Sequence, residues 1–154
     1  KRNYPSGGSL YPVETYLIAT GIELQTPAVF HYHPSDHALE RLWDLPEHFS
    51  MKDVSIYGAT LPFSLLIVFA SVWNRSSAKY GHLAYLHALL ETGHMSQNVL
   101  LVATALGLAS RPLAGFKDEK VIKLLDLNKD IEQPLLVISL GKVGAPHPQL
   151  SELE

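Results

Sequence analysis

Cysteine is absent from the 154 residues of this chain. Its absence excludes disulfide frameworks, zinc–thiolate sites, iron–sulfur clusters and thiol nucleophiles, and it fits a reducing cytoplasm. Charge is also sparse, because charged residues make up 18% of the chain and the net charge is −3. Scattered basic residues leave no electrostatic footprint for nucleic acid or for an anionic membrane. We therefore expect a cytoplasmic protein that binds neither.

Long hydrophobic runs are missing as well. The longest apolar stretch, residues 61–73, is shorter than the ~20 residues that a membrane-spanning helix needs. Hydrophobic residues nevertheless make up 47% of the chain, which excludes disorder and allows a sizeable core. The length predicts a single domain over residues 1–154. A chain so poor in charge can hide part of its apolar surface against a partner.

Apolar patterning predicts an α+β fold on a mixed sheet. Strands are expected at 13–20, 28–33, 38–43, 63–73, 110–116 and 134–142, the second and third joined as a hairpin by the turn P-S-D-H. Helices are expected at 80–108 and 117–127, and one or two short helices within 46–57. The polar segment 74–81 is expected to be a loop.

The long predicted helix carries one polar stripe on an otherwise apolar cylinder. Its members lie seven, four, three and four residues apart: Tyr80, His87, Glu91, His94 and Asn98. Burying such groups unpaired costs about 1–3 kcal/mol each, so the stripe should face a polar cavity or a partner. A hydrogen-bonded interface stripe is the favoured interpretation.

A metal site on this helix is the less favoured alternative. Glu91 and His94 have the Glu-x-x-His spacing of di-iron carboxylate bundles, but those bundles need a second such motif and two further glutamates. We therefore expect no metal here. Gly93 costs about 1 kcal/mol against alanine in a helix, which suggests that another helix or backbone approaches it.

Histidines cluster around the predicted hairpin. Strand alternation places His31 and His33 on one face, where a metal pair is geometrically possible, and His37 follows in the turn. No carboxylate or third histidine has a suitable spacing on that face. A hairpin with outward polar residues is the favoured interpretation.

Two short segments could carry chemistry, although the usual dinucleotide, P-loop and serine-hydrolase motifs are absent. The segment Ser6-Gly7-Gly8-Ser9 lets backbone approach a flat or anionic ligand without a Cβ clash. Lys79 and Tyr80 are adjacent groups that can act as a general base. An ordinary turn and a solvated lysine are the alternatives.

The order of these signals resembles the nitroreductase-like flavoprotein family. More narrowly, the chain is similar to the SagB-type branch, the azoline dehydrogenases of thiazole/oxazole-modified peptide pathways. Six segments carry the likeness: P-S-G-G-S-L-Y-P-V-E-T-Y-L (5–17), F-H-Y-H-P-S-D-H-A-L-E (30–40), K-Y-G-H-L-A-Y (79–85), A-L-L-E-T-G-H-M-S-Q-N (88–98), A-L-G-L (105–108) and P-L-A-G-F…L-L-D-L (112–127). The resemblance implies a mainly antiparallel sheet flanked by helices, with a long central helix at a homodimer interface.

The resemblance also implies an FMN site. The loop expected to lie against the flavin contains Pro5, Ser6, Gly7 and Gly8. A second segment is expected to pass over the isoalloxazine, with a backbone N–H of Ala114 or Gly115 at flavin N5; it contains Pro112, Leu113, Ala114 and Gly115. Arg2 and Lys142 are the candidates for the phosphate. The family's upstream Ser-x-Arg segment, which holds the phosphate, is not among these 154 residues.

In that branch the implied reaction is oxidation of an azoline ring in a ribosomal peptide, with the proton passing to Lys79 or Tyr80 and the hydride to flavin N5. A cyclodehydratase partner is possible. One alternative is an NAD(P)H-dependent nitro- or quinone reductase. Another, of a different class, is a flavin-free structural or partner-binding module with the same fold.

Overall fold

Six antiparallel strands form the sheet of the computed structural model, which describes residues 2–20, 26–56 and 63–142. Their order is β3-β2-β1-β4-β6-β5. The strands are β1 (Val13–Ala19), β2 (Ala28–His33), β3 (Ala38–Asp44), β4 (Leu65–Val72), β5 (Leu108–Leu113) and β6 (Glu132–Lys142). The six predicted strands and the predicted hairpin are thus confirmed. Every pairing between described strands is antiparallel, so the parallel pair that a mixed sheet requires is not found there.

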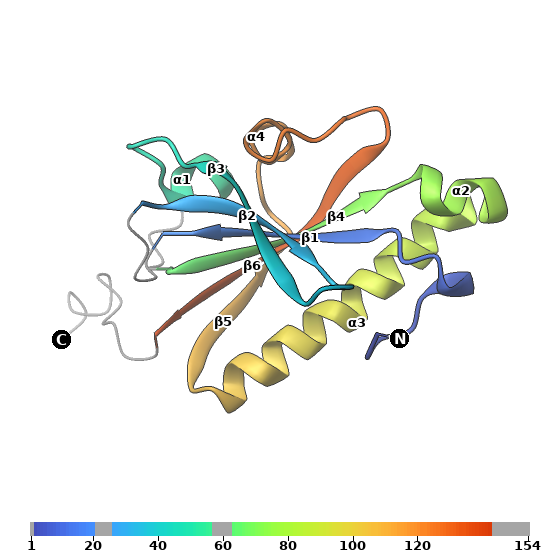
Figure 1. Ribbon diagram of the computed structural model, residues 1–154, viewed down its shortest axis with the longest axis horizontal. Coiled ribbons are helices and arrows are strands. Elements are labelled where there is room, and N and C mark those ends of the chain that lie inside the picture. Colours follow the sequence, from blue (N-terminus) through green and yellow to red (C-terminus); the bar gives the residue numbers. More distant parts are fainter. Residues whose placement is uncertain (1, 21–25, 57–62, 143–154) are drawn as a thin grey trace.

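The helices lie on both faces of this sheet (Figure 1). They are α1 (Met51–Val54), α2 (Asn74–Tyr80), α3 (Leu83–Ala105) and α4 (Asp118–Leu124). The 23-residue α3 covers one face, and the shorter α1 and α4 cover the other. No described helix is long and apolar enough to span a membrane.

Two predictions around the long helix are wrong. The polar segment 74–81, expected as a loop, forms α2, which packs against α3. The long helix does not begin at Tyr80, because the chain turns at Gly81 before α3 starts at Leu83. Gly81 has a φ of 53°, a left-handed conformation that glycine adopts without a Cβ penalty.

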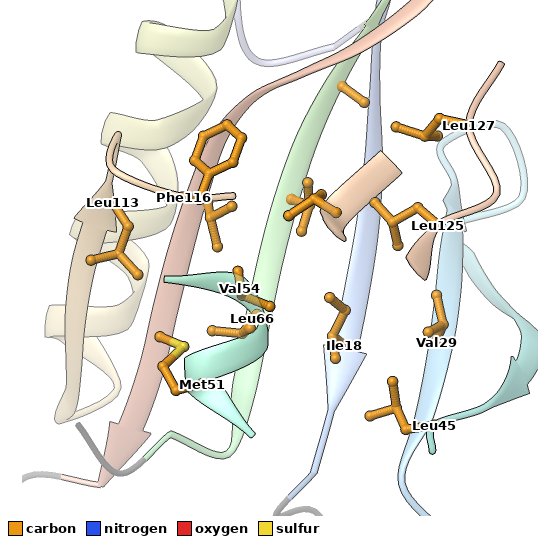
Figure 2. Packing of buried hydrophobic residues seen from close by; sticks show 14 residues of the cluster. Ile18, Val29, Leu45, Met51, Val54, Leu66, Leu113, Phe116, Leu125 and Leu127 are labelled. Atoms are coloured by element: carbon orange, nitrogen blue, oxygen red, sulfur yellow. The ribbon is translucent and has the colours of Figure 1, made fainter. Parts of the chain in front are cut away.

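Alternation along β4 divides the core between the two faces. Leu66 and Val68 point toward α1 and α4, whereas Ile67 and Phe69 point toward α3. Figure 2 shows Leu66 beside Ile18 on the first face, where both side chains are fully buried. A strand that is apolar on both faces lies in the middle of a sheet, as β4 does.

Candidate functional site

The glycine-rich opening loop lies directly on α2 and α3. A Cβ on Gly8 would stand 2.6 Å from the Tyr80 hydroxyl and 2.8 Å from the Lys79 ammonium nitrogen. A Cβ on Gly7 would stand 2.9 Å from Nδ1 of His87. Gly8 also has a φ of 61°. Only glycines allow this close approach, and they bring four of the predicted site residues together with His87.

Behind the loop lies a buried carboxylate. Glu91 is 2% exposed, and burial raises the pKa of its carboxyl group, although the nearby Ser6 hydroxyl, Val13 backbone and Arg2 act to lower it. Neither carboxylate oxygen has a partner in hydrogen-bonding geometry among the described residues. The same holds for Nδ1 of His87. Buried polar atoms without partners are uncommon, and they mark this region as one where function competes with stability.

The predicted polar stripe divides into three environments. His87 and Glu91 turn inward beside the loop, and the rings of Tyr80 and His87 meet edge to face with centroids 4.5 Å apart. His94 is exposed, and its Nδ1 lies 2.7 Å from the Leu90 carbonyl. Asn98 lines an apolar cavity. A single interface stripe is therefore wrong at Glu91, which is buried within the chain.

That cavity has a volume of about 400 Å³ and lies between the C-terminal half of α3 and the sheet. Its walls are mostly apolar and include Tyr4, Phe69, Met95 and Leu106. Lys79 and Tyr80 are not part of its lining. The sequence did not predict this cavity, because its shape depends on how α3 packs on the strands.

The two phosphate candidates lie on different elements of the fold. Arg2 donates to the Tyr4 hydroxyl at 2.6 Å and stacks over the Tyr11 ring at 4.3 Å, just before β1. Lys142 ends β6 at the opposite end of the sheet, where it pairs with the first residue of β5.

The second predicted flavin segment lies at the end of β5, on the edge of the sheet. Leu113 is 5% exposed and packs into the core beneath α1 and α4, whereas Pro112 and Ala114 are exposed. The Gly115 carbonyl accepts a hydrogen bond from Ile56 N–H at 3.2 Å. Among the described residues, no hydrogen bond or ring contact joins this segment to the opening loop. Its role at a flavin stays a prediction.

A planar cofactor fits the opening loop. Gly8 is exposed, has no Cβ and stands beside Lys79 and Tyr80, so a flat ring could lie against its backbone. Pro5, which is also exposed, borders the same turn, and Arg2 offers a cation nearby. These residues offer the shape and donors that a flavin needs on one of its sides.

Comparison with known proteins identifies the architecture. The sequence profile of the nitroreductase family matches residues 2–142. The chain belongs to the nitroreductase family. Microcin B17-processing protein McbC of Escherichia coli is 34% identical over 153 residues, which covers 94% of this chain. A predicted nitroreductase of Methanocaldococcus jannaschii is 26% identical and covers 92% of the chain.

Solved structures agree with this nitroreductase fold. The E. coli microcin synthetase McbBCD complex with truncated pro-MccB17 bound contains a chain that matches with a TM-score of 0.82 and 33% identity over 94% of this chain. A predicted nitroreductase from Anabaena variabilis matches with a TM-score of 0.85 and 30% identity over 93% of this chain. The present chain spans 55% of McbC, 56% of the matching chain in the complex and 30% of the Anabaena chain.

Two groups around the opening loop were not predicted from the sequence. Arg75 of α2 pairs with Glu14 of β1 and also donates to the Tyr11 carbonyl at 3.3 Å, which ties α2 to the strand after the loop. His87 was predicted as a member of the polar stripe on the long helix, but its contact with Gly7 was not predicted. No local signal could have found these pairs, because their partners lie far apart in the sequence.

Proposed function

We propose that this protein is an FMN-dependent oxidoreductase of SagB type that oxidises azoline rings in a ribosomal peptide. The convergence of Lys79 and Tyr80 on exposed Gly8 carries the proposal, because it places two proton-accepting groups beside a backbone suited to a flat ring. The similarity to McbC, named for the processing of microcin B17, supports a peptide substrate. The peptide in the McbBCD complex supports the same substrate class.

The FMN would be held by the two predicted segments. Pro5, Ser6, Gly7 and Gly8 form the first, and the backbone at Ala114 and Gly115 belongs to the second. When bound, the flavin supplies a two-electron acceptor that no side chain can provide. Arg2 is the phosphate contact available at the loop end of the sheet.

The chain's own part in the reaction is to hold the ring and to take a proton. Lys79 and Tyr80 come from the last turn of α2, which the Arg75–Glu14 pair fixes against β1. Proton abstraction requires the basic atom to lie within about 2.6–3.2 Å of the atom that carries the proton. An azoline ring bound next to a flavin on Gly8 would have to come within this distance of the Lys79 nitrogen or the Tyr80 oxygen.

Single substitutions test this assignment. Lys79→Ala and Tyr80→Phe should each reduce azoline oxidation about 10²–10⁴-fold, the usual effect of losing a positioned acid–base group. Loss of two hydrogens per ring is measured by mass spectrometry of the precursor peptide, and flavin content by visible absorbance. Lys129→Ala, at an exposed position, is the matched control. Undiminished oxidation in both site variants would overturn the base assignment.

An NAD(P)H-dependent nitro- or quinone reductase is the second candidate. The similarity to the Methanocaldococcus nitroreductase, which covers most of this chain, favours it. Such a reaction takes hydride from a nicotinamide and does not need a base on α2. Retained reductase turnover in Lys79→Ala and Tyr80→Phe, with no azoline oxidation by the wild type, would select this function. A colourless protein that gains nothing from added FMN would instead select the flavin-free module.

A homodimer through α3 belongs to the same proposal. Several large apolar side chains on α3 are exposed, among them Leu86, Leu90 and Leu101. Exposed apolar surface of this extent usually marks an interaction site. Leu86→Glu should shift a dimer toward monomer in analytical ultracentrifugation, whereas Leu39→Glu, on β3, should not. A wild type that is monomeric at all concentrations would contradict this, and a cyclodehydratase subunit would then be the candidate for the same face.

A further inference from the structure

A compact group of metal-binding side chains lies on the β2–β3 hairpin, at the far edge of the sheet from β5. His31, His33 and Glu40 each offer one ligand atom, and these atoms all lie within 4.8 Å of one another. Among the residues that the structure describes, this is the one group of three or more such side chains. The expectation that no carboxylate shares this face is therefore wrong.

Strand geometry explains how the three residues meet. His31 and His33 lie two apart on β2 and therefore point to the same face. Glu40 of β3 is the register partner of His31, so its side chain rises on that face too. The third hairpin histidine, His37, bonds instead to the Tyr32 hydroxyl at 2.8 Å and stands apart from the group.

The distances suit a shared cation. Nδ1 of His31 lies 3.3 Å from Nε2 of His33, and Nε2 of His33 lies 2.8 Å from a Glu40 oxygen. Two ligand atoms that bind one tetrahedral zinc, each at about 2.1 Å, lie roughly 3.4 Å apart. Small side-chain rotations would complete a site of two nitrogens and one oxygen.

A second layer of contacts prepares His31 for metal binding. Its Nε2 lies 2.8 Å from the Glu14 carboxylate, which is 13% exposed and also pairs with Arg75. The ionised carboxylate has only acceptors, so Nε2 of His31 donates and Nδ1 keeps its lone pair facing the group. Metal-binding histidines usually have this arrangement.

Nε2 of His33 lies within hydrogen-bonding distance of both the Glu40 oxygen and Nδ1 of His31. When Nε2 carries the proton of the neutral ring, this one N–H faces two acceptors. When the neutral His33 ring carries its proton on Nδ1, Nε2 becomes a ligand, and one cation satisfies all three atoms. His33 and Glu40 are 41% and 59% exposed, so a cation can enter from solvent.

We propose that His31, His33 and Glu40 bind a divalent borderline cation of the Zn²⁺ type. Two imidazoles and one carboxylate suit such an ion better than Mg²⁺ or Ca²⁺ and leave a fourth position for water or a ligand. The ion would link β2 to β3. His31 also contacts Glu14, which pairs with Arg75, so the site is connected through these contacts to α2.

Zinc binding to the chelator-stripped full chain, measured by competition with a chromophoric chelator at pH 7.5, tests the site. The wild type should bind one Zn²⁺, and the melting temperature should rise with added Zn²⁺ but not with Mg²⁺. His33→Ala and Glu40→Ala should each weaken Zn²⁺ binding by more than tenfold. Glu14→Gln should weaken it by about 10–100-fold, as loss of a second-layer partner does.

Two controls separate this site from adventitious binding. His37→Ala on the same hairpin and His94→Ala on α3 should leave the zinc affinity unchanged. His33 and Glu40 are partly exposed, so these variants should keep the wild-type circular dichroism spectrum. Zinc affinity that survives in the His33→Ala/Glu40→Ala double variant, or the absence of a one-to-one complex in the wild type, would overturn the proposal.

Discussion

The two faces of the sheet differ in how completely their buried groups are satisfied. Beneath α1 and α4 the buried side chains are mostly apolar, as Ile18, Leu66 and Val137 illustrate. The buried Ser139 hydroxyl on this face donates a hydrogen bond to the Arg111 carbonyl at 3.3 Å. All buried side-chain polar atoms that lack a partner among the described residues lie instead on or beside the α3 face. They belong to Ser71, Ser76, His87, Glu91 and Thr92.

The α3 face also exposes most of the chain's large apolar side chains. They are Leu83, Tyr85, Leu86, Leu89, Leu90, Leu101, Val102 and, at the end of the helix, Leu106. Buried polar groups without partners and exposed apolar groups both reduce the stability of an isolated chain. The comparison indicates that the α1/α4 face stabilises the fold, whereas the α3 face carries the groups that the proposed dimer would cover.

The largest expected effect compares a leucine on each face. Leu66→Ala, at a fully buried site under α1 and α4, should lower the free energy of unfolding by about 2–5 kcal/mol. Leu90→Ala, 54% exposed on α3, should change it by no more than about 0.5 kcal/mol. Urea unfolding at low protein concentration measures both. Equal losses would contradict the division of roles between the faces.

A smaller effect concerns the buried carboxylate on α3. The folded-state pKa of Glu91 lies above its ordinary value of 4.5, so the folded protein holds this proton more strongly than the unfolded chain. Stability therefore falls as the pH rises from below 4.5 through the folded-state pKa, and the loss is complete above it.

Substitution of this carboxylate should remove that pH dependence. Glu91→Gln should flatten the profile and raise the free energy of unfolding at neutral pH by about 1 kcal/mol, the order of the cost of a buried unpaired group. Thermal unfolding between pH 3 and pH 8 measures it, and Glu119→Gln, exposed on α4, is the control. A wild-type slope that persists in Glu91→Gln would locate the titration elsewhere.

The smallest effect compares two glycines. Gly8→Ala should cost on the order of 1 kcal/mol, because its φ is positive and its Cβ would collide with Tyr80 and Lys79. Gly93→Ala should raise stability by up to about 1 kcal/mol, since nothing described lies within 4 Å of its Cβ. The expected close approach to Gly93 is thus not made by the described part of this chain. If a second copy makes it, the same substitution should weaken the dimer in ultracentrifugation.

The strands of the sheet could be predicted from the sequence more completely than the helices. β4 is apolar on both sides, and the turn between β2 and β3 is short and polar, so local patterns determined both. α2 has no apolar period of its own and is held by packing on α3, which a local pattern cannot predict.

The candidate site was predictable in pieces but not as an assembly. Gly8 and Lys79 were each predicted as site residues. Their contact was not predictable, because about half of the chain separates them in the sequence. Glu14 and Arg75, which also pair, are 61 residues apart in the sequence. The position of Glu40, in contrast, could have been predicted from the sequence. The short turn determines the hairpin register, and that register places Glu40 opposite His31.

The strand order also determines how the chain must fold. β4 occupies the middle of the sheet, but its neighbours come from both ends of the chain, since Val13 pairs with Ser71 and Leu65 with Leu140. The local hairpin of β2 and β3 can form alone, whereas β4 acquires its partners only after long loops have closed. We therefore expect folding on the millisecond timescale or slower. Until its last neighbour pairs with it, the apolar strand β4 would have an unpaired edge. We expect this strand to be the segment most prone to aggregate during folding.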